Sequence, residues 1–241
     1  MHLIITMERI SPLFICAIFI TLISCRSTKD FFKDAIDYTK SEQYDKAILN
    51  YNKVIKRDSN FAYAYSNRGK IKYRLMDYEG AIEDFNMALN QDPNNETLYD
   101  FRGKSKQFLK QYQSSIEDFN KIIELNPESK EGYFNRGWAK KQLGYLDEAI
   151  LDYNIAIEID PQDARIYKYR GYAKSNLEDT KGALEDFNKS ISLNSRDHHS
   201  FYNRGIARQK LGDLKGACSD WNVAKKLGDN EADEMIKKYC N

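Results

Sequence analysis

The chain has 241 residues, with 37 Lys and Arg against 36 Asp and Glu, so its formal net charge is +1. Proteins that bind nucleic acids or anionic membranes through charge carry a large basic excess, and this balance argues against both classes. Hydrophobic residues make up 41% of the chain, which is sufficient for a packed core.

The N-terminus holds an apolar run over residues 13–23 that follows Arg9. Such a run has the length of a signal-peptide core and is shorter than the roughly 20 residues that span a bilayer. It ends in Leu22-Ile23-Ser24-Cys25. This ending resembles the bacterial lipoprotein signal, in which an aliphatic, a variable and a small residue precede Cys.

The resemblance implies a signal peptide over 1–24, cleavage before Cys25, a lipid on Cys25 and a linker over 25–27. A plain secretory signal and an uncleaved anchor are the alternatives, and Met7 is an alternative start. Arg26 is not the Asp that retains some lipoproteins at the inner membrane. We therefore expect a membrane-anchored lipoprotein of the bacterial cell envelope, with the outer membrane favoured.

From residue 28 onward the sequence repeats every 34 residues without insertion. An Arg-Gly pair marks five of the repeats, at Arg68-Gly69, Arg102-Gly103, Arg136-Gly137, Arg170-Gly171 and Arg204-Gly205. An aromatic residue precedes each Gly by four positions, a small residue follows it by twelve, and a large aromatic residue follows it by sixteen. Phe31, Ala35, Ala47 and Tyr51 extend the frame backward by one unit.

This pattern resembles the tetratricopeptide repeat (TPR), with Arg-Gly in place of the usual Leu-Gly. The resemblance implies an all-α, right-handed superhelical solenoid of six TPR helical hairpins plus a C-terminal capping helix. The predicted repeats cover 28–61, 62–95, 96–129, 130–163, 164–197 and 198–229. The apolar positions agree, because they recur at helical spacing and Pro closes the second helix of three repeats.

The Arg of Arg-Gly is predicted to be structural. Each such Arg is matched by an Asp at the twenty-third repeat position, from Asp84 to Asp220. In repeat 1 both partners change together, to Asp34 and Asn50, which favours an ion pair within one repeat. An Asn stands at the twenty-fifth position of all six repeats, and we expect it to make a local hydrogen bond.

The concave face is the predicted partner site, because the family lines its groove with the first helix of each repeat. These positions vary between repeats and mix aromatic residues with Lys, Arg and Asn, a composition suited to peptide binding. The candidate groove residues are Tyr63, Asn67, Lys70, Tyr73, Lys104, Phe108, Asn135, Trp138, Lys141, Arg165, Lys168 and Tyr172, with Arg74, Phe101, Phe134, Tyr169, Tyr202 and Asn203 on the same face.

Catalysis and metal binding have little support in the sequence. No Cys-His, Ser-His-Asp or phosphate-loop pattern occurs, so no catalytic residue and no cofactor are predicted. His198 and His199 are adjacent, and neighbouring helical residues are not expected to face one metal ion, so no metal is predicted. The Lys and Asn positions with which some TPR domains clamp a chaperone C-terminus are not matched.

The C-terminus is predicted to cover the last repeat. Leu227-Gly228 marks a helix end, and residues 230–241 form a capping helix, with Ala232, Met235, Ile236 and Tyr239 on one apolar face. Cys218 and Cys240 lie at similar distances before and after Gly228. They form either a disulfide between cap and repeat 6 or two buried thiols.

The sequence thus predicts a non-catalytic TPR scaffold, lipid-anchored in a bacterial envelope, that binds a protein or peptide partner in its concave groove. Two alternatives remain, namely a structural subunit of an envelope or outer-membrane assembly, and a cytoplasmic adaptor if the signal is not processed.

Overall fold

The computed structural model describes residues 26–240, which form thirteen α-helices and no strand. The first helices of six hairpins are α2 (Thr28–Lys40), α4 (Ala62–Arg74), α6 (Glu96–Phe108), α8 (Lys130–Gln142), α10 (Ala164–Asn176) and α12 (His198–Lys210). The second helices are α3 (Tyr44–Arg57), α5 (Tyr78–Gln91), α7 (Tyr112–Leu125), α9 (Leu146–Ile159), α11 (Thr180–Leu193) and α13 (Leu214–Lys226).

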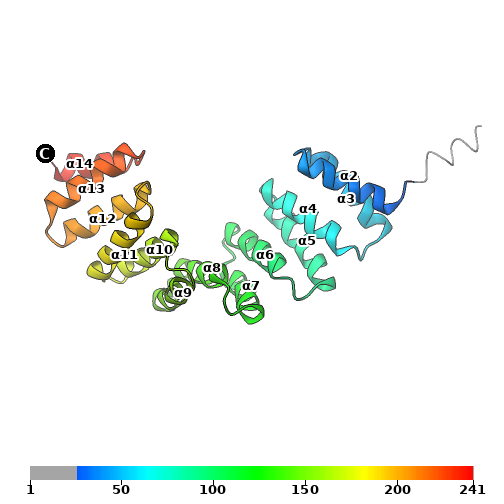
Figure 1. Cartoon of the computed structure of the whole chain (residues 1–241), viewed down its shortest axis with the longest axis horizontal. Helices are drawn as coiled ribbons and strands as arrows, with labels where there is room; N and C mark the ends of the chain where they lie inside the picture. Colours follow the sequence, from blue (N-terminus) through cyan, green and yellow to red (C-terminus); the bar gives the residue numbers. More distant parts are fainter. Residues whose placement is uncertain (1–25, 241) are drawn as a thin grey trace, which may run out of the picture.

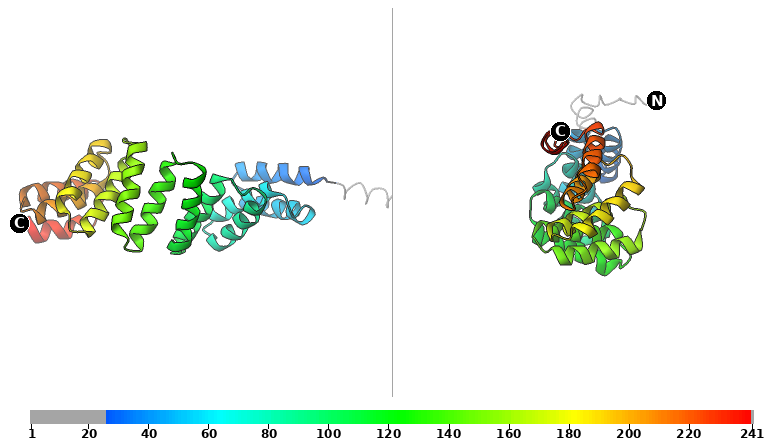
Figure 2. Two further views of the ribbon diagram at one scale, coloured as in Figure 1. Left: turned by 90° about the horizontal axis from the view of Figure 1, so that it is seen from below. Right: turned by 90° about the vertical axis from the view of Figure 1, so that its left-hand side faces the viewer.

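The first helix of each hairpin begins at the first residue of a predicted repeat. The hairpins stack into an arc in which α4, α6, α8 and α10 lie on the inner side and α5, α7, α9 and α11 on the outer side (Figure 1). Seen along its length the arc coils, as Figure 2 shows, so the all-α superhelical solenoid is confirmed.

Two predictions, the signal peptide and the lipid on Cys25, lie outside the described residues. Within residues 26–240, each helix is too short or too polar to cross a bilayer.

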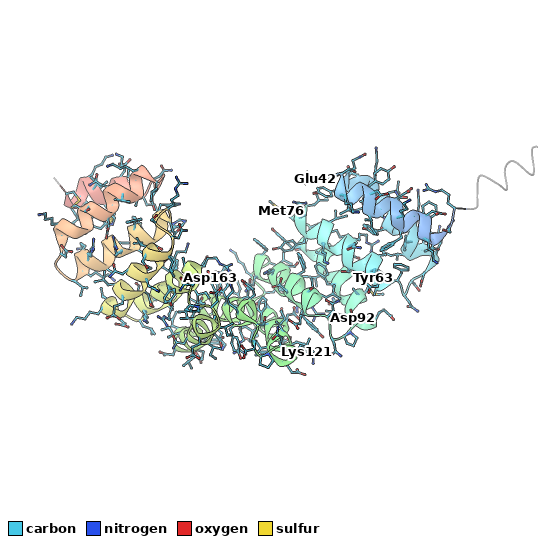
Figure 3. The ribbon with its side chains drawn as sticks, in the orientation of Figure 1. Glu42, Tyr63, Met76, Asp92, Lys121 and Asp163 are labelled. Carbon is cyan, nitrogen blue, oxygen red and sulfur yellow. A yellow bond between two sulfur atoms is a disulfide. The ribbon has the colours of Figure 1, made fainter. Side chains whose placement is uncertain are left out.

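The turn between the two helices of each hairpin needs a left-handed residue at the fifteenth repeat position. Gly144 and Gly212 supply it with φ of +84° and +87°. Elsewhere a residue with a Cβ adopts the same conformation, at Glu42, Met76, Lys110 and Glu178. The left-handed conformation costs a residue with a Cβ about 1–2 kcal/mol. These residues adopt it because the packing of the two helices requires this turn. Met76 stands at the tip of its turn in Figure 3 and is highly exposed.

The Gly of Arg-Gly lets the two helices of a hairpin touch. A Cβ on Gly69, Gly103 or Gly171 would lie 2.8 Å from the ring of the aromatic residue sixteen positions later, too close for a real contact. In repeat 6 the partner is Trp221, which is fully buried. The glycine and the aromatic residue therefore form one packing unit that recurs along the core.

The predicted ion pair within each repeat is confirmed in repeats 2 to 6. In repeat 4, Arg136 donates to Asp152 from Nη2 at 2.6 Å and from Nε at 3.0 Å. Asp152 is 2% exposed. Its Oδ2 also forms an ion pair with Lys140 Nζ at 2.8 Å. Sequence reasoning missed this second cation, which is Lys72, Lys106, Lys174 or Arg208 in the other four repeats.

The expectation of a local bond for the repeated Asn was wrong in five of six repeats. Asn120 accepts a hydrogen bond at 2.8 Å from Nη1 of Arg136, which belongs to the next repeat. The same contact joins each of the other four arginines, Arg68, Arg102, Arg170 and Arg204, to the Asn of the repeat before it. Each guanidinium therefore holds its own hairpin together and fixes it to its neighbour. Only Asn222, which has no following repeat, bonds locally, to the Cys218 carbonyl at 2.8 Å.

The cap helix α14 (Ala232–Tyr239) begins two residues later than the predicted Asn230. The difference arises because the Asp229 carboxylate accepts the backbone N–H groups of Glu231 and Ala232, at 3.0 and 3.3 Å. The predicted apolar face packs on Trp221 and covers the last repeat.

Cys218 and Cys240 are joined by a disulfide in the structure, with their Cα atoms 5.7 Å apart. The bond connects α13 to the end of α14 across 22 residues.

We expect replacement of Asp152 by Ala to destabilise the protein by about 3 kcal/mol, because it leaves two partly buried cations without their carboxylate. In a double-mutant cycle with Arg136→Ala, the coupling energy should be about 1–3 kcal/mol by urea unfolding. Glu158→Ala, an exposed acid on the same helix, serves as the control and should change stability by about 0.5 kcal/mol or less. Additive effects of the two substitutions would refute the pairing.

Peptide mapping without reduction should recover the segments that contain Cys218 and Cys240 as one linked species. Reduction should lower the free energy of unfolding by about 3 kcal/mol, since the bond closes a loop of this size. The same reductant should have no effect on a Cys218→Ser/Cys240→Ser variant. Recovery of both cysteines as free thiols would show that the disulfide does not form.

Candidate functional site

Three adjoining hollows run along the first helices on the inner side of the arc. The first, of about 330 Å³, lies between α4 and α6 and includes Tyr63, Asn67 and Lys70. The second shares Lys70 and adds Tyr73, and the third, of about 300 Å³, shares Tyr73 and reaches α10. We call this continuous surface the inner groove; its three hollows are lined by Ala62, Tyr63, Ser66, Asn67, Lys70, Tyr73, Arg74, Gln91, Asp92, Asn95, Thr97, Leu98, Phe101, Lys104, Gln107, Phe108, Phe134, Asn135, Trp138 and Tyr169.

Aromatic rings line the middle of the inner groove and hold one another in place. Tyr73 contacts Phe101 edge to face at 5.4 Å and Phe108 at 5.9 Å. Phe108 is 58% exposed, although it stacks on Tyr78. Trp138 is partly buried and packs edge to face on Tyr112. These rings offer rigid apolar contact area at a low cost in conformational entropy.

Two of the predicted cations, Lys70 and Lys141, have no carboxylate partner among residues 26–240. Each is partly buried, and burial lowers the pKa of both lysines because a desolvated ammonium is disfavoured. Lys70 lies over the Phe101 ring at 5.6 Å. An acidic ligand would restore the favourable interactions that these ammonium groups have lost to burial.

The other predicted cations are engaged within the protein. Lys104 pairs with Asp100 at 2.8 Å, and Lys168 pairs with Asp197 at 3.2 Å. Arg165 bonds to both Asp163 and Glu131.

Asp163 caps α10 on the inner side of the arc (Figure 3). Burial alone would raise the pKa of Asp163, but hydrogen bonds from Arg165 and Lys130 outweigh it and lower the pKa to about 2. The Arg165–Glu131 and Lys130–Asp163 ion pairs join α10 to α8, the first helices of neighbouring repeats. Arg165 is therefore engaged in holding these helices together.

Two buried polar atoms at the inner groove lack a hydrogen-bond partner, namely Asn135 Nδ2 and Asp100 Oδ1. Burial raises the pKa of Asp100 despite its pairing with Lys104. Asp100 lines a smaller hollow of about 190 Å³ beside the first one, together with Glu131. Buried polar groups are almost always satisfied, so these two atoms leave a desolvation cost that is not offset within residues 26–240.

The remaining predicted residues divide into exposed and packed ones. Tyr63 is 71% exposed at the end of α4 opposite Met76 (Figure 3). Tyr172 packs against Tyr169 and Phe187, and burial raises the pKa of its hydroxyl. Sequence reasoning missed Gln107, which lines the third hollow and donates to the Asn135 carbonyl at 2.9 Å. Gln107 stands at a repeat position that lines the groove in the TPR family, and this position could have identified it.

Three models of the repeat family match the sequence. One TPR repeat model matches residues 37–75 and 137–178, and two tetratricopeptide repeat models match residues 62–95 and 97–129. These matches span over half of the chain. No curated protein matches the sequence as a relative.

Solved structures share the fold. PilF of Pseudomonas aeruginosa is 15% identical with a TM-score of 0.71, over 88% of this chain and 97% of PilF. MamA of Desulfovibrio magneticus RS-1 is 20% identical with a TM-score of 0.65, over 69% and 94%. YrrB, described as a TPR protein with an unusual peptide-binding site, is 20% identical with a TM-score of 0.63, over 78% and 97%.

The repeated Arg-Gly frame, the six stacked hairpins and the matching family models agree, and the chain belongs to the tetratricopeptide repeat family.

Proposed function

We propose that this protein is a lipid-anchored TPR scaffold of a bacterial envelope that binds an extended acidic segment of a protein partner in the inner groove. The observation that carries the proposal is the partly buried Lys70, which lines two of the three hollows and has no carboxylate partner among residues 26–240. Lys70, on α4, stands beside the half-buried rings of Tyr73 and Phe101. Lys141, on α8, also has no carboxylate partner among the described residues, but it is not among the residues that line the three hollows.

The arrangement favours a peptide over a small molecule. The groove consists of three shallow hollows that share lining residues, and it has no single deep cavity. Aromatic side chains of the partner would pack on Phe108 and Trp138, while one of its carboxylates would pair with Lys70.

The alternative of an assembly subunit would use the outer helices. Their exposed apolar side chains include Leu49, Met87 and Leu151, from three different helices. Single exposed apolar residues are common on soluble proteins, so the inner groove is the better-supported surface.

Anchoring through Cys25 rests on the sequence Leu22-Ile23-Ser24-Cys25. One lipidated terminus would tether the solenoid to a membrane and leave its groove free. The first described helix follows this position closely, since α2 starts at Thr28 with its capping box on Ser27. The repeats would therefore stand close to the membrane surface.

Replacing Trp138 by Ala should lower partner affinity by about 2 kcal/mol, because it removes a central aromatic contact. Lys70→Met should also weaken binding while the free energy of unfolding is kept or raised, since the variant no longer buries an ammonium without a carboxylate partner. Pull-down from detergent-solubilised membranes with quantitative mass spectrometry would measure recovery of the partner, and urea unfolding would measure stability.

The matched control is Leu151→Ala with Lys121→Ala, on the outer helices α9 and α7; Lys121 lies on the outer side in Figure 3. Partner recovery should be unchanged in this control. Retained binding by the inner variants, with loss in the outer control, would reject groove binding and favour the assembly alternative.

Cells fed labelled palmitate should incorporate it into the wild-type chain and into Cys16→Ser, but not into Cys25→Ser. The Cys16 variant is the matched control, because it alters a cysteine that lies outside the predicted cleavage motif. Label on neither protein, or label that persists in Cys25→Ser, would rule out the proposed anchor.

A further inference from the structure

His198, His199 and Asp229 lie together at the C-terminal end of the solenoid. His198 and His199 begin α12, and Asp229 follows α13 and caps α14. The sequence predicted that two adjacent histidines would not face one metal ion. In the structure the two rings nevertheless lie 3.9 Å apart between centroids, and one ligand atom from each of the three residues falls within 4.8 Å of the others.

The spacing of these atoms is close to that of a zinc site. His198 Nδ1 lies 3.0 Å from Asp229 Oδ2. Tetrahedral zinc with bonds of about 2.0–2.1 Å holds its ligand atoms about 3.3 Å apart. The His–Asp pair therefore already has nearly the required separation, and His199 has to move only by a side-chain adjustment.

Asp229 is held in place before any ligand arrives. Its side chain is 6% exposed, and its Oδ1 accepts two backbone N–H groups at the start of α14. Oδ2 is thereby directed to His198. Hydrogen bonds that orient a ligating carboxylate are a regular feature of metal sites, because they lower the cost of assembling the ligands.

The repeat framework does not require these residues. Position 2 of the repeat, where His199 stands, holds Tyr63, Thr97, Glu131 and Arg165 in the four preceding repeats. The His199 imidazole makes no hydrogen bond to any residue of 26–240, so a simple His198–Asp229 ion pair leaves it unexplained. Two imidazoles and one carboxylate form a donor set that suits zinc.

We propose that His198, His199 and Asp229 bind a zinc ion, which joins repeat 6 to the cap helix. Three protein ligands leave one coordination position open. The zinc would stabilise the cap independently of the Cys218–Cys240 bond.

The test uses the full chain without a polyhistidine tag, titrated with zinc alone in competition with a chelating dye. We expect a dissociation constant of about 10 μM or tighter, weakened at least about tenfold by His198→Ala, His199→Ala and Asp229→Asn. The Asn side chain at position 229 keeps an amide oxygen that can accept the backbone N–H groups at the start of α14. Glu234→Gln, an exposed acid on α14, is the control and should bind zinc as the wild type does.

A second measurement does not depend on variants. Zinc should protect His198 and His199 from diethylpyrocarbonate, as mapped by mass spectrometry. Binding weaker than about 1 mM, equal affinity in all variants, or equal modification with and without zinc would each overturn the proposal.

Discussion

A buried aspartate in each of repeats 2 to 6 is the interaction on which the architecture depends. It accepts from two cations on the first helix of its hairpin, and the arginine among them also reaches an Asn of the preceding hairpin. Burying a carboxylate is costly unless it is paired and fully hydrogen-bonded, so the three partners must recur together. They tie helix to helix and repeat to repeat at the same point, which explains the strict 34-residue period and leaves the inner face free to vary.

Repeat 1 lacks this set of charges, and the way it differs supports the constraint. It has Asp34 in place of the Arg, Tyr38 in place of the second cation and Asn50 in place of the Asp, so all three charges change at once. That joint change allowed the Arg–Asp pair to be predicted. The second cation was not predicted because a lysine four residues after the Arg looks like ordinary helix surface. The role of the Asn required the neighbouring repeat to be placed in space.

Other features were hidden for physical reasons. The left-handed turn residue is a Gly at Gly144 but a Met at Met76, so composition gave no common signal. The aromatic residues of the groove were predicted from first-helix positions that vary between repeats. Which lysines lack partners did not follow, since a partner such as Asp197 lies 29 residues from Lys168 along the chain. Likewise, the turn after α13 brings Asp229 to His198 across 31 residues, a contact that helical periodicity does not encode.

We propose that the repeated positions are structural and that the variable inner face receives the partner. The most direct measurement places a photoreactive amino acid at Phe108 in the inner groove or at Leu151 on the outer helix α9, both well exposed, and irradiates intact cells. The account predicts a discrete crosslinked protein from position 108 and none from position 151. Crosslinking of the same protein from position 151 alone would contradict it.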